Sequence, residues 1–182
     1  MDKELTDKEI DDVLANNSET DMNPNGKSQQ VFGNYLGRML RQDESRRDDP
    51  PLLIKILIGY FLAKPEERLQ SKGIFRITSK WEQIKELEAH LNNGDYEVIE
   101  HAKQPQDIAN LLKYTLKYLR IPLFPYKQYF DMGKQRVMDE AKRVKQVKGI
   151  LAELKQTENG LQAYNTLKLI FLFFKEVDRN EP

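Results

Sequence analysis

The stretch PQDIANLLKYTLKYLRIP, residues 105–122, decides the fold class. Its large aliphatic residues recur every three or four positions, a spacing that places them on one face of an α-helix. Pro105 is tolerated in a first helical turn, Asp107 complements the helix dipole there, and Pro122 disfavours a continuing helix. The stretch therefore predicts an amphipathic helix with a buried face made of Ile108, Leu111, Leu112, Leu116 and Leu119.

Helical patterns precede this stretch as well. The apolar segment that follows Pro50-Pro51 predicts a buried helix running to about residue 63, although its β-branched residues also permit a strand. Residues 64–67 then read as a loop. Further on, Ser79 and Glu82 form a capping-box pattern, which predicts a helix over about 79–94. Its apolar stripe is expected to contain Trp81, Ile84, Leu87 and Leu91.

Two more helices are predicted after residue 122, from about 137 to 154 and from about 163 to 177. The last one is apolar almost all round, which indicates burial among other helices. No useful length of the chain shows the alternation typical of a strand. The sequence therefore predicts an all-helical bundle.

Composition and charge divide the chain into a tail and a body. Residues 1–30 carry eight acidic and three basic side chains, a net charge of −5 that leaves +5 on residues 31–182 of this neutral chain. We expect a flexible acidic tail over 1–30 and one folded domain over 31–182. The absence of cysteine and the presence of only two histidines argue against disulfides and zinc sites, and they fit a cytoplasmic protein. A mildly basic body suits an anionic partner.

One segment breaks the helical periodicity, Gly73-Ile74-Phe75-Arg76. Glycine permits a sharp backbone turn, and the two apolar side chains that follow it can anchor a loop in the core. Such a loop would project Arg76 outward. The simpler alternative is that Arg76 pairs with a nearby acidic side chain.

A second candidate feature is cationic. Lys113, Lys117 and Arg120 lie three or four residues apart and share one face of the helix at 105–119, away from its apolar stripe. An ordinary solvated face explains this trio if it stands alone. Beside a projecting arginine, it indicates a surface that binds a partner.

The sequence offers no self-contained catalytic site. It has no phosphate-binding Gly-x-x-x-x-Gly-Lys-Ser/Thr motif, no Gly-x-Ser-x-Gly motif and no cysteine nucleophile. The basic segment 142–148 could bind nucleic acid or anionic lipid. A solvated helix face explains it better, because no aromatic residues alternate with its cations, and no nucleic-acid partner is expected.

Three ordered blocks resemble the Rho GTPase-activating (RhoGAP) domain family. The first comprises Phe32-Gly33, the helix that follows Pro51 and the loop Gly73-Ile74-Phe75-Arg76-Ile77-Thr78-Ser79, which is similar to the family's Gly-Ile-Phe-Arg hallmark. The second runs from Asp107 to Pro125, and the third is Tyr164-Asn165-Thr166-Leu167-Lys168. The resemblance implies an all-helical fold, a Rho-family small GTPase of Rho, Rac or Cdc42 type as partner, and contact with membranes only through that GTPase.

The resemblance also implies roles for individual residues. Arg76 matches the family's arginine finger, which the domain supplies to the GTPase as a catalytic group. Lys113 matches a lysine that supports the finger loop and meets the GTPase switch region, and Lys117 and Arg120 extend the partner-binding face. No cofactor of its own is implied, because GTP and Mg²⁺ belong to the partner.

The sequence departs from the family pattern at two kinds of position. Lys117 stands where the family usually has arginine, and Arg120 replaces the first proline of a Pro-x-Pro pair. Lysine keeps the charge but loses planar, bidentate hydrogen bonding. The family's last helices would follow residue 182, so we expect part of the helix at 163–177 to be uncovered. A GTPase-binding module without rate enhancement is the alternative function.

Overall fold

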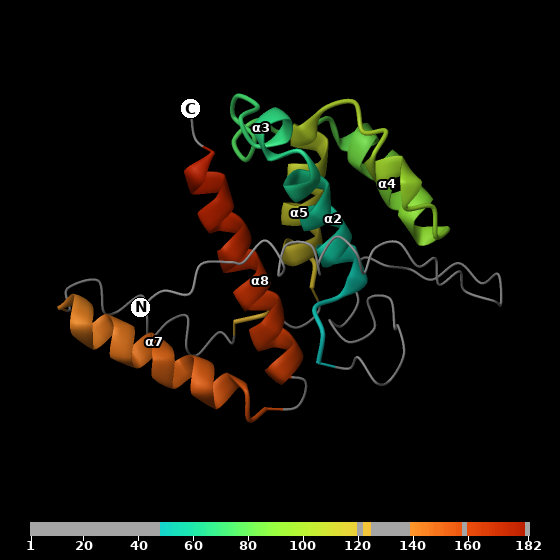
Figure 1. Cartoon of the computed structure of the whole chain (residues 1–182). Helices are drawn as coiled ribbons and strands as arrows, with labels where there is room; N and C mark the ends of the chain where they lie inside the picture. Colours follow the sequence, from blue (N-terminus) through green and yellow to red (C-terminus); the bar gives the residue numbers. More distant parts are fainter. Residues whose placement is uncertain (1–47, 120–121, 125–138, 158–159, 181–182) are drawn as a thin grey trace.

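The computed structural model describes residues 48–119, 122–124, 139–157 and 160–180, and every regular element within these ranges is helical (Figure 1). This confirms the predicted all-helical fold. The predicted domain boundary at residue 31 lies outside the described residues and stays a prediction. The elements are α2 (Leu52–Ala63), α3 (Pro65–Arg68), α4 (Trp81–Asn92), the 3-10 turn η3 (Glu97–Ile99), α5 (Pro105–Lys117), α7 (Glu140–Leu154) and α8 (Gly160–Arg179).

Helix α2 forms the centre of the core and packs against both α5 and α8. Its first turn is closed by a hydrogen bond from the Lys55 amide to the Pro51 carbonyl (3.1 Å), and it ends where Pro65 restricts the preceding residue. Burial extends round most of its circumference, which explains why its sequence shows no polar face. The fully buried side chains of this core include Leu53, Ile54, Leu57, Ile58 and Phe61 of α2, with Ile108 and Leu111 of α5.

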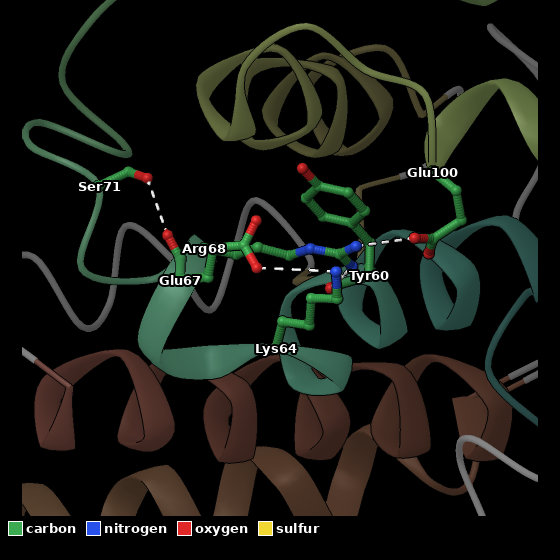
Figure 2. A network of polar contacts seen from close by, with 6 residues as sticks. All are labelled: Tyr60, Lys64, Glu67, Arg68, Ser71 and Glu100. Carbon is green, nitrogen blue, oxygen red and sulfur yellow. Dashed lines mark hydrogen bonds and ion pairs between the residues drawn. The ribbon is translucent and has the colours of Figure 1, made fainter.

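A buried arginine ties α3 to both α2 and η3 (Figure 2). The Arg68 guanidinium donates hydrogen bonds to the Tyr60 carbonyl and, at 2.7 Å, to Glu100, and it lies 3.8 Å from the centroid of the Tyr60 ring. A buried charge requires such partners. Burial raises the pKa of the Tyr60 phenol, although the Arg68 charge opposes the shift. The segment predicted as a loop at 64–67 is thus a short helix that fixes the start of the next loop.

The structure corrects two details of α4. Its N-cap is Lys80, whose backbone amide donates to the Gln83 side chain (3.3 Å), and Ser79 is used elsewhere as a hydrogen-bond acceptor. Ile84, Leu87 and Leu91 are buried as predicted, but the Trp81 side chain is 52% exposed. A 3–4 spacing places Trp81 on the apolar stripe, whereas its position at the very start of the helix carries it past the edge of the core.

Helix α8 is less buried than its composition predicted. Phe173 and Ile170 belong to the core, whereas Phe171 is 65% and Phe174 45% exposed. The prediction of burial all round was therefore wrong, and the expected uncovered apolar surface is present. No helix in the described ranges is long and apolar enough to cross a membrane.

Candidate functional site

The loop between α3 and α4 turns sharply at Gly73. The Gly73 carbonyl accepts hydrogen bonds from the amides of Arg76 (2.9 Å) and Ile77 (2.8 Å), while the Ile74 amide donates to the Ser71 carbonyl (3.1 Å). Gly73 itself has φ of +68°, a conformation that L-residues with side chains rarely adopt. The turn therefore depends on glycine, and it sets the direction in which residue 76 leaves the loop.

Two side chains of this turn, those of Ile74 and Phe75, pack against the core. Ile74 is only 8% exposed. The Phe75 ring packs among three others, with centroid distances of 6.2 Å to Phe61, 6.0 Å to Phe173 and 5.7 Å to Phe174. Edge-to-face and tilted aromatic pairs at these distances are favourable. The loop is thus held from below by rings of α2 and α8.

Helix α5 holds the same loop from the side. The Gln106 side-chain amide donates to the Lys72 carbonyl (3.1 Å), and that of Asn110 donates to the Ile77 carbonyl (2.8 Å) and to the Ser79 hydroxyl oxygen (3.1 Å). These two residues lie four apart, so they face the loop from successive turns. Together they fix both ends of the segment 72–79.

Lys113 completes this support at the centre of the loop. Its ammonium group donates to the Phe75 carbonyl at 3.0 Å. That carbonyl belongs to the peptide bond that leads into Arg76. The side chain remains exposed, so its other two donors stay accessible to solvent or to a bound partner.

Arg76 belongs to this supported loop and is exposed. Its side chain forms no ion pair or hydrogen bond with any residue that the structure describes. The alternative interpretation, in which Arg76 pairs with a nearby acid, therefore finds no support in the described part of the chain. An exposed guanidinium on a fixed loop can offer its fork of donors to an anionic group outside the protein.

The other predicted cations are only partly placed. Lys117 is exposed one turn beyond Lys113, and its ammonium nitrogen lies 5.3 Å from the centroid of the Tyr118 ring. Arg120 lies outside the described residues. The structure thus brings Lys113 and Lys117 together on one face of α5. Within the described ranges, no group of three or more His, Asp or Glu side chains could hold a metal ion.

The loop contacts of Gln106 and Asn110 were missed by the sequence analysis. One signal was available, because asparagine is a poor residue for a helix interior and Asn110 interrupts an otherwise apolar run. It is 9% exposed and also donates to the Gln106 carbonyl (2.8 Å). A buried amide in a helix interior is an indication that something nearby needs a hydrogen-bond donor.

The comparisons with known proteins agree with one another. The family model described as "RhoGAP domain" matches residues 51–182. The chain is 30% identical to Rho GTPase-activating protein gacY of Dictyostelium discoideum over 85% of its length, and 24% identical to mouse Rho GTPase-activating protein 24 over 81%. It covers 20% and 19% of those two proteins, about a fifth of each.

Among solved structures, human Rho GTPase activating protein 15 shares the fold. The TM-score is 0.61 at 17% sequence identity, and the match covers 84% of this chain and 69% of that one. Similarity at this level of identity bears on the fold alone. The predicted helical bundle is therefore of the type found in that protein.

Proposed function

Because the chain belongs to the RhoGAP domain family, we propose that it stimulates GTP hydrolysis by a Rho-family small GTPase and that Arg76 is its catalytic residue. The family relation implies Rho GTPase activation in general. The assignment to Arg76 is the finer step, and it rests on the arrangement of the loop. A cytoplasmic location is part of the same proposal.

The chemistry asked of Arg76 is electrostatic. Transfer of the γ-phosphoryl group to water spreads negative charge over the phosphoryl and bridging oxygens. A guanidinium that enters the site presents a planar set of donors to those oxygens and excludes water from them. Such an arginine supplied in trans is worth roughly 10³–10⁵ in rate, or about 4–7 kcal/mol of the barrier.

A single observation carries this assignment: Arg76 is exposed and free of ion pairs with described residues, while the backbone on both sides of it is fixed. Electrostatic catalysis requires a group that is already oriented, because reorganisation during the reaction would cancel the gain. The Gly73 turn, the partly buried Phe75 ring and the Lys113 hydrogen bond provide that orientation. An arginine used only for stability would be expected to contact its own chain.

The remaining cations fall into two proposed roles. Lys113 supports the loop through the Phe75 carbonyl. Because its side chain is exposed, it would also contact the partner. Lys117 and Arg120 would bind acidic or backbone oxygen groups of the partner. As lysine is a compact, strongly hydrated charge, Lys117 would steer association more than it fixes geometry.

The test is single-turnover GTP hydrolysis by a panel of Rho-family GTPases of Rho, Rac and Cdc42 type, with the unsubstituted chain, Arg76→Ala and Arg76→Lys. We expect the saturating rate to fall about 10³-fold in Arg76→Ala, because the transition-state donors are lost. Affinity for the GTP-bound state should change only a few-fold. Arg76→Lys keeps the charge without the fork and should recover only a small part of the rate.

Two outcomes would contradict the assignment. Equal acceleration by Arg76→Ala and the unsubstituted chain would show that Arg76 is not the catalytic residue. Tight binding to the GTP-bound state without any acceleration by the unsubstituted chain would support the alternative, a GTPase-binding module that lacks rate enhancement. Lys113→Met provides a further comparison. It should lower the rate by loosening the loop, although the Arg76 side chain itself is retained.

A further inference from the structure

Three aromatic side chains form a row beside the finger loop, and the activity proposed above uses none of them. Trp81 of α4 and Tyr118 at the end of α5 are 52% and 45% exposed, and Tyr114 lies between them. The ring centroids are 5.5 Å apart for Trp81 and Tyr114 and 4.5 Å apart for Tyr114 and Tyr118. We call these three residues the aromatic row. Each ring is fixed by its neighbour, so the row presents a stiff apolar surface.

Lysines flank the aromatic row at both ends. The Lys85 ammonium nitrogen lies 4.9 Å from the Trp81 ring centroid and 3.5 Å from the Tyr114 hydroxyl, and that of Lys117 lies 5.3 Å from the Tyr118 ring. Cation–π contacts at these distances orient long side chains that would otherwise be mobile. The hydrogen bond from Lys85 to Glu88 raises the pKa of the ammonium group, which therefore stays charged.

The aromatic row continues the surface that carries Arg76. Gln106, Asn110, Tyr114 and Tyr118 are spaced four residues apart along α5 and lie on successive turns. The first two hold the loop by its backbone, and the next two carry the row. Ile77 directly follows Arg76 and is 45% exposed. Its carbonyl accepts a hydrogen bond from Asn110, which lies one turn of α5 before Tyr114. The aromatic row therefore lies one to two turns of α5 beyond the hydrogen bond that holds the loop of Arg76.

We propose that the aromatic row is a specificity surface for the GTPase that receives Arg76, contacting an apolar patch of that GTPase edged by carboxylates. The inference rests on the proposed function and deepens it. Exposed Trp and Tyr side chains are enriched among the residues that carry interface energy, because they bury a large area and lose little rotamer entropy. The neighbouring Lys85, Lys113 and Lys117 favour an acidic rim on the partner.

A protein surface fits the aromatic row better than single-stranded nucleic acid does. Bases stack on open ring faces. Here the Trp81 and Tyr114 rings meet at 65°, the Tyr114 and Tyr118 rings meet at 49°, and Lys85 lies over the Trp81 face. These contacts occupy ring faces on which a base would have to stack. Contacts with protein groups do not require an open ring face, since aromatic rings also interact through their edges.

The test separates affinity from catalysis with the full chain and the GTPases of the panel. We expect Trp81→Ala and Tyr118→Ala each to raise the dissociation constant for the GTP-bound GTPase about ten- to thirtyfold. The single-turnover rate at saturating chain should stay within about twofold, since neither residue reaches the nucleotide. Trp81→Phe should recover part of the affinity. Phe171→Ala removes a more exposed ring on α8 (65%) and should change neither quantity.

The results distinguish failure of this inference from failure of the proposed function. If Arg76→Ala abolishes acceleration while Trp81→Ala and Tyr118→Ala bind as tightly as the unsubstituted chain, the aromatic row has no role in recognition. A lower saturating rate with unchanged affinity would overturn it as well. If the unsubstituted chain binds no GTPase of the panel, the proposed function fails and this inference with it. Competition between a single-stranded oligonucleotide and the GTPase, lost in Trp81→Ala, would assign the row to nucleic acid.

Discussion

The loop at residues 72–79 and helix α7 are held in opposite ways. The loop is short, and its backbone is fixed from two directions, by side chains of α5 and by the Phe75 ring packed against the core. Helix α7 is long, and its buried side chains are Ile150 and Leu154 near its C-terminal end. Figure 1 shows it extending to one side of α8, away from α4 and α5. Val144 in its first half is 46% exposed.

The difference shows where this fold is required to be precise. A group that acts on a transition state must be placed before the reaction, and misplacement by about 1 Å can cost about a hundredfold in rate. Hydrogen bonds from α5 to the Lys72, Phe75 and Ile77 carbonyls provide such placement for residues 72–79. Helix α7 is packed mainly by one end, so intrinsic helix propensity contributes more to its stability than it does for a helix buried along its length. Substitutions in the two regions should therefore behave differently.

The largest effect on stability is expected at Phe75, whose ring packs the loop against the core. Phe75→Ala removes a ring that contacts Phe61, Phe173 and Phe174, and it should lower the free energy of unfolding by about 3 kcal/mol. Chemical denaturation with a tryptophan or circular-dichroism signal measures the change. Phe75→Leu keeps most of the apolar volume and should lose much less. Equal losses in the two variants would mean that the ring contacts do not anchor the loop.

The next effect tests the turn itself. A Cβ on residue 73 would lie 2.9 Å from Cγ1 of Ile77, and the residue would have to keep φ of +68°. Gly73→Ala should therefore cost more than the roughly 1–2 kcal/mol of a left-handed alanine alone. Gly94→Ala is a matched control, because φ there is +81° and no atom lies within 4 Å of the added Cβ. Similar losses at both positions would contradict the contact with Ile77.

In α7 the same substitution should have the opposite sign. Gly149 lies inside the helix, and a Cβ added there meets no atom within 4 Å. Gly149→Ala should therefore stabilise the chain by about 0.5–1 kcal/mol, since alanine has the higher helix propensity. Thermal unfolding followed by circular dichroism measures this. A destabilised variant would mean that residue 149 packs closely against another part of the protein.

The smallest effect on stability near neutral pH is expected from Tyr96, in the segment between α4 and α5. Burial raises the pKa of Tyr96 to about 12 from 10.0. The unfolded chain releases this proton near its ordinary pKa of about 10. Between these values the unfolded state binds fewer protons than the folded state, so stability is lost as pH rises from about 10 toward 12.

Urea denaturation across this pH range measures the loss. Tyr96→Phe should flatten the decline, leaving a smaller slope from Tyr60, whose pKa burial also raises. A variant with the same decline as the unsubstituted chain would show that Tyr96 ionises equally in both states.

Much of the architecture could be predicted because its causes are local. The prolines at 51, 65, 105 and 122 and the 3–4 spacing of apolar residues place the ends and buried faces of α2 and α5. Gly73 predicts a sharp turn for the same reason, since only glycine tolerates the required φ. The candidate residues Arg76 and Lys113 could be named from this pattern and from the family resemblance. Their proposed roles await the measurements described above.

Contacts between distant segments could not be predicted. Spacing along α5 indicates that Gln106 and Asn110 lie on successive turns, but it contains no information about which carbonyls lie opposite them. The exposure of Trp81 and Phe171 was mispredicted for a related reason. Periodicity reports the face on which a side chain lies, whereas exposure depends on whether another element covers that face.

The sequence by itself therefore determined the long helices, the turn at Gly73 and the identity of the candidate arginine. Each depends on backbone sterics and side-chain period within a few residues. Only the tertiary structure decided that α5 holds the loop at the Lys72, Phe75 and Ile77 carbonyls and that the Trp81 ring of α4 packs against the Tyr114 ring of α5. Those contacts join residues about 30 positions apart, and their geometry is set by how α2, α5 and α8 pack around one core.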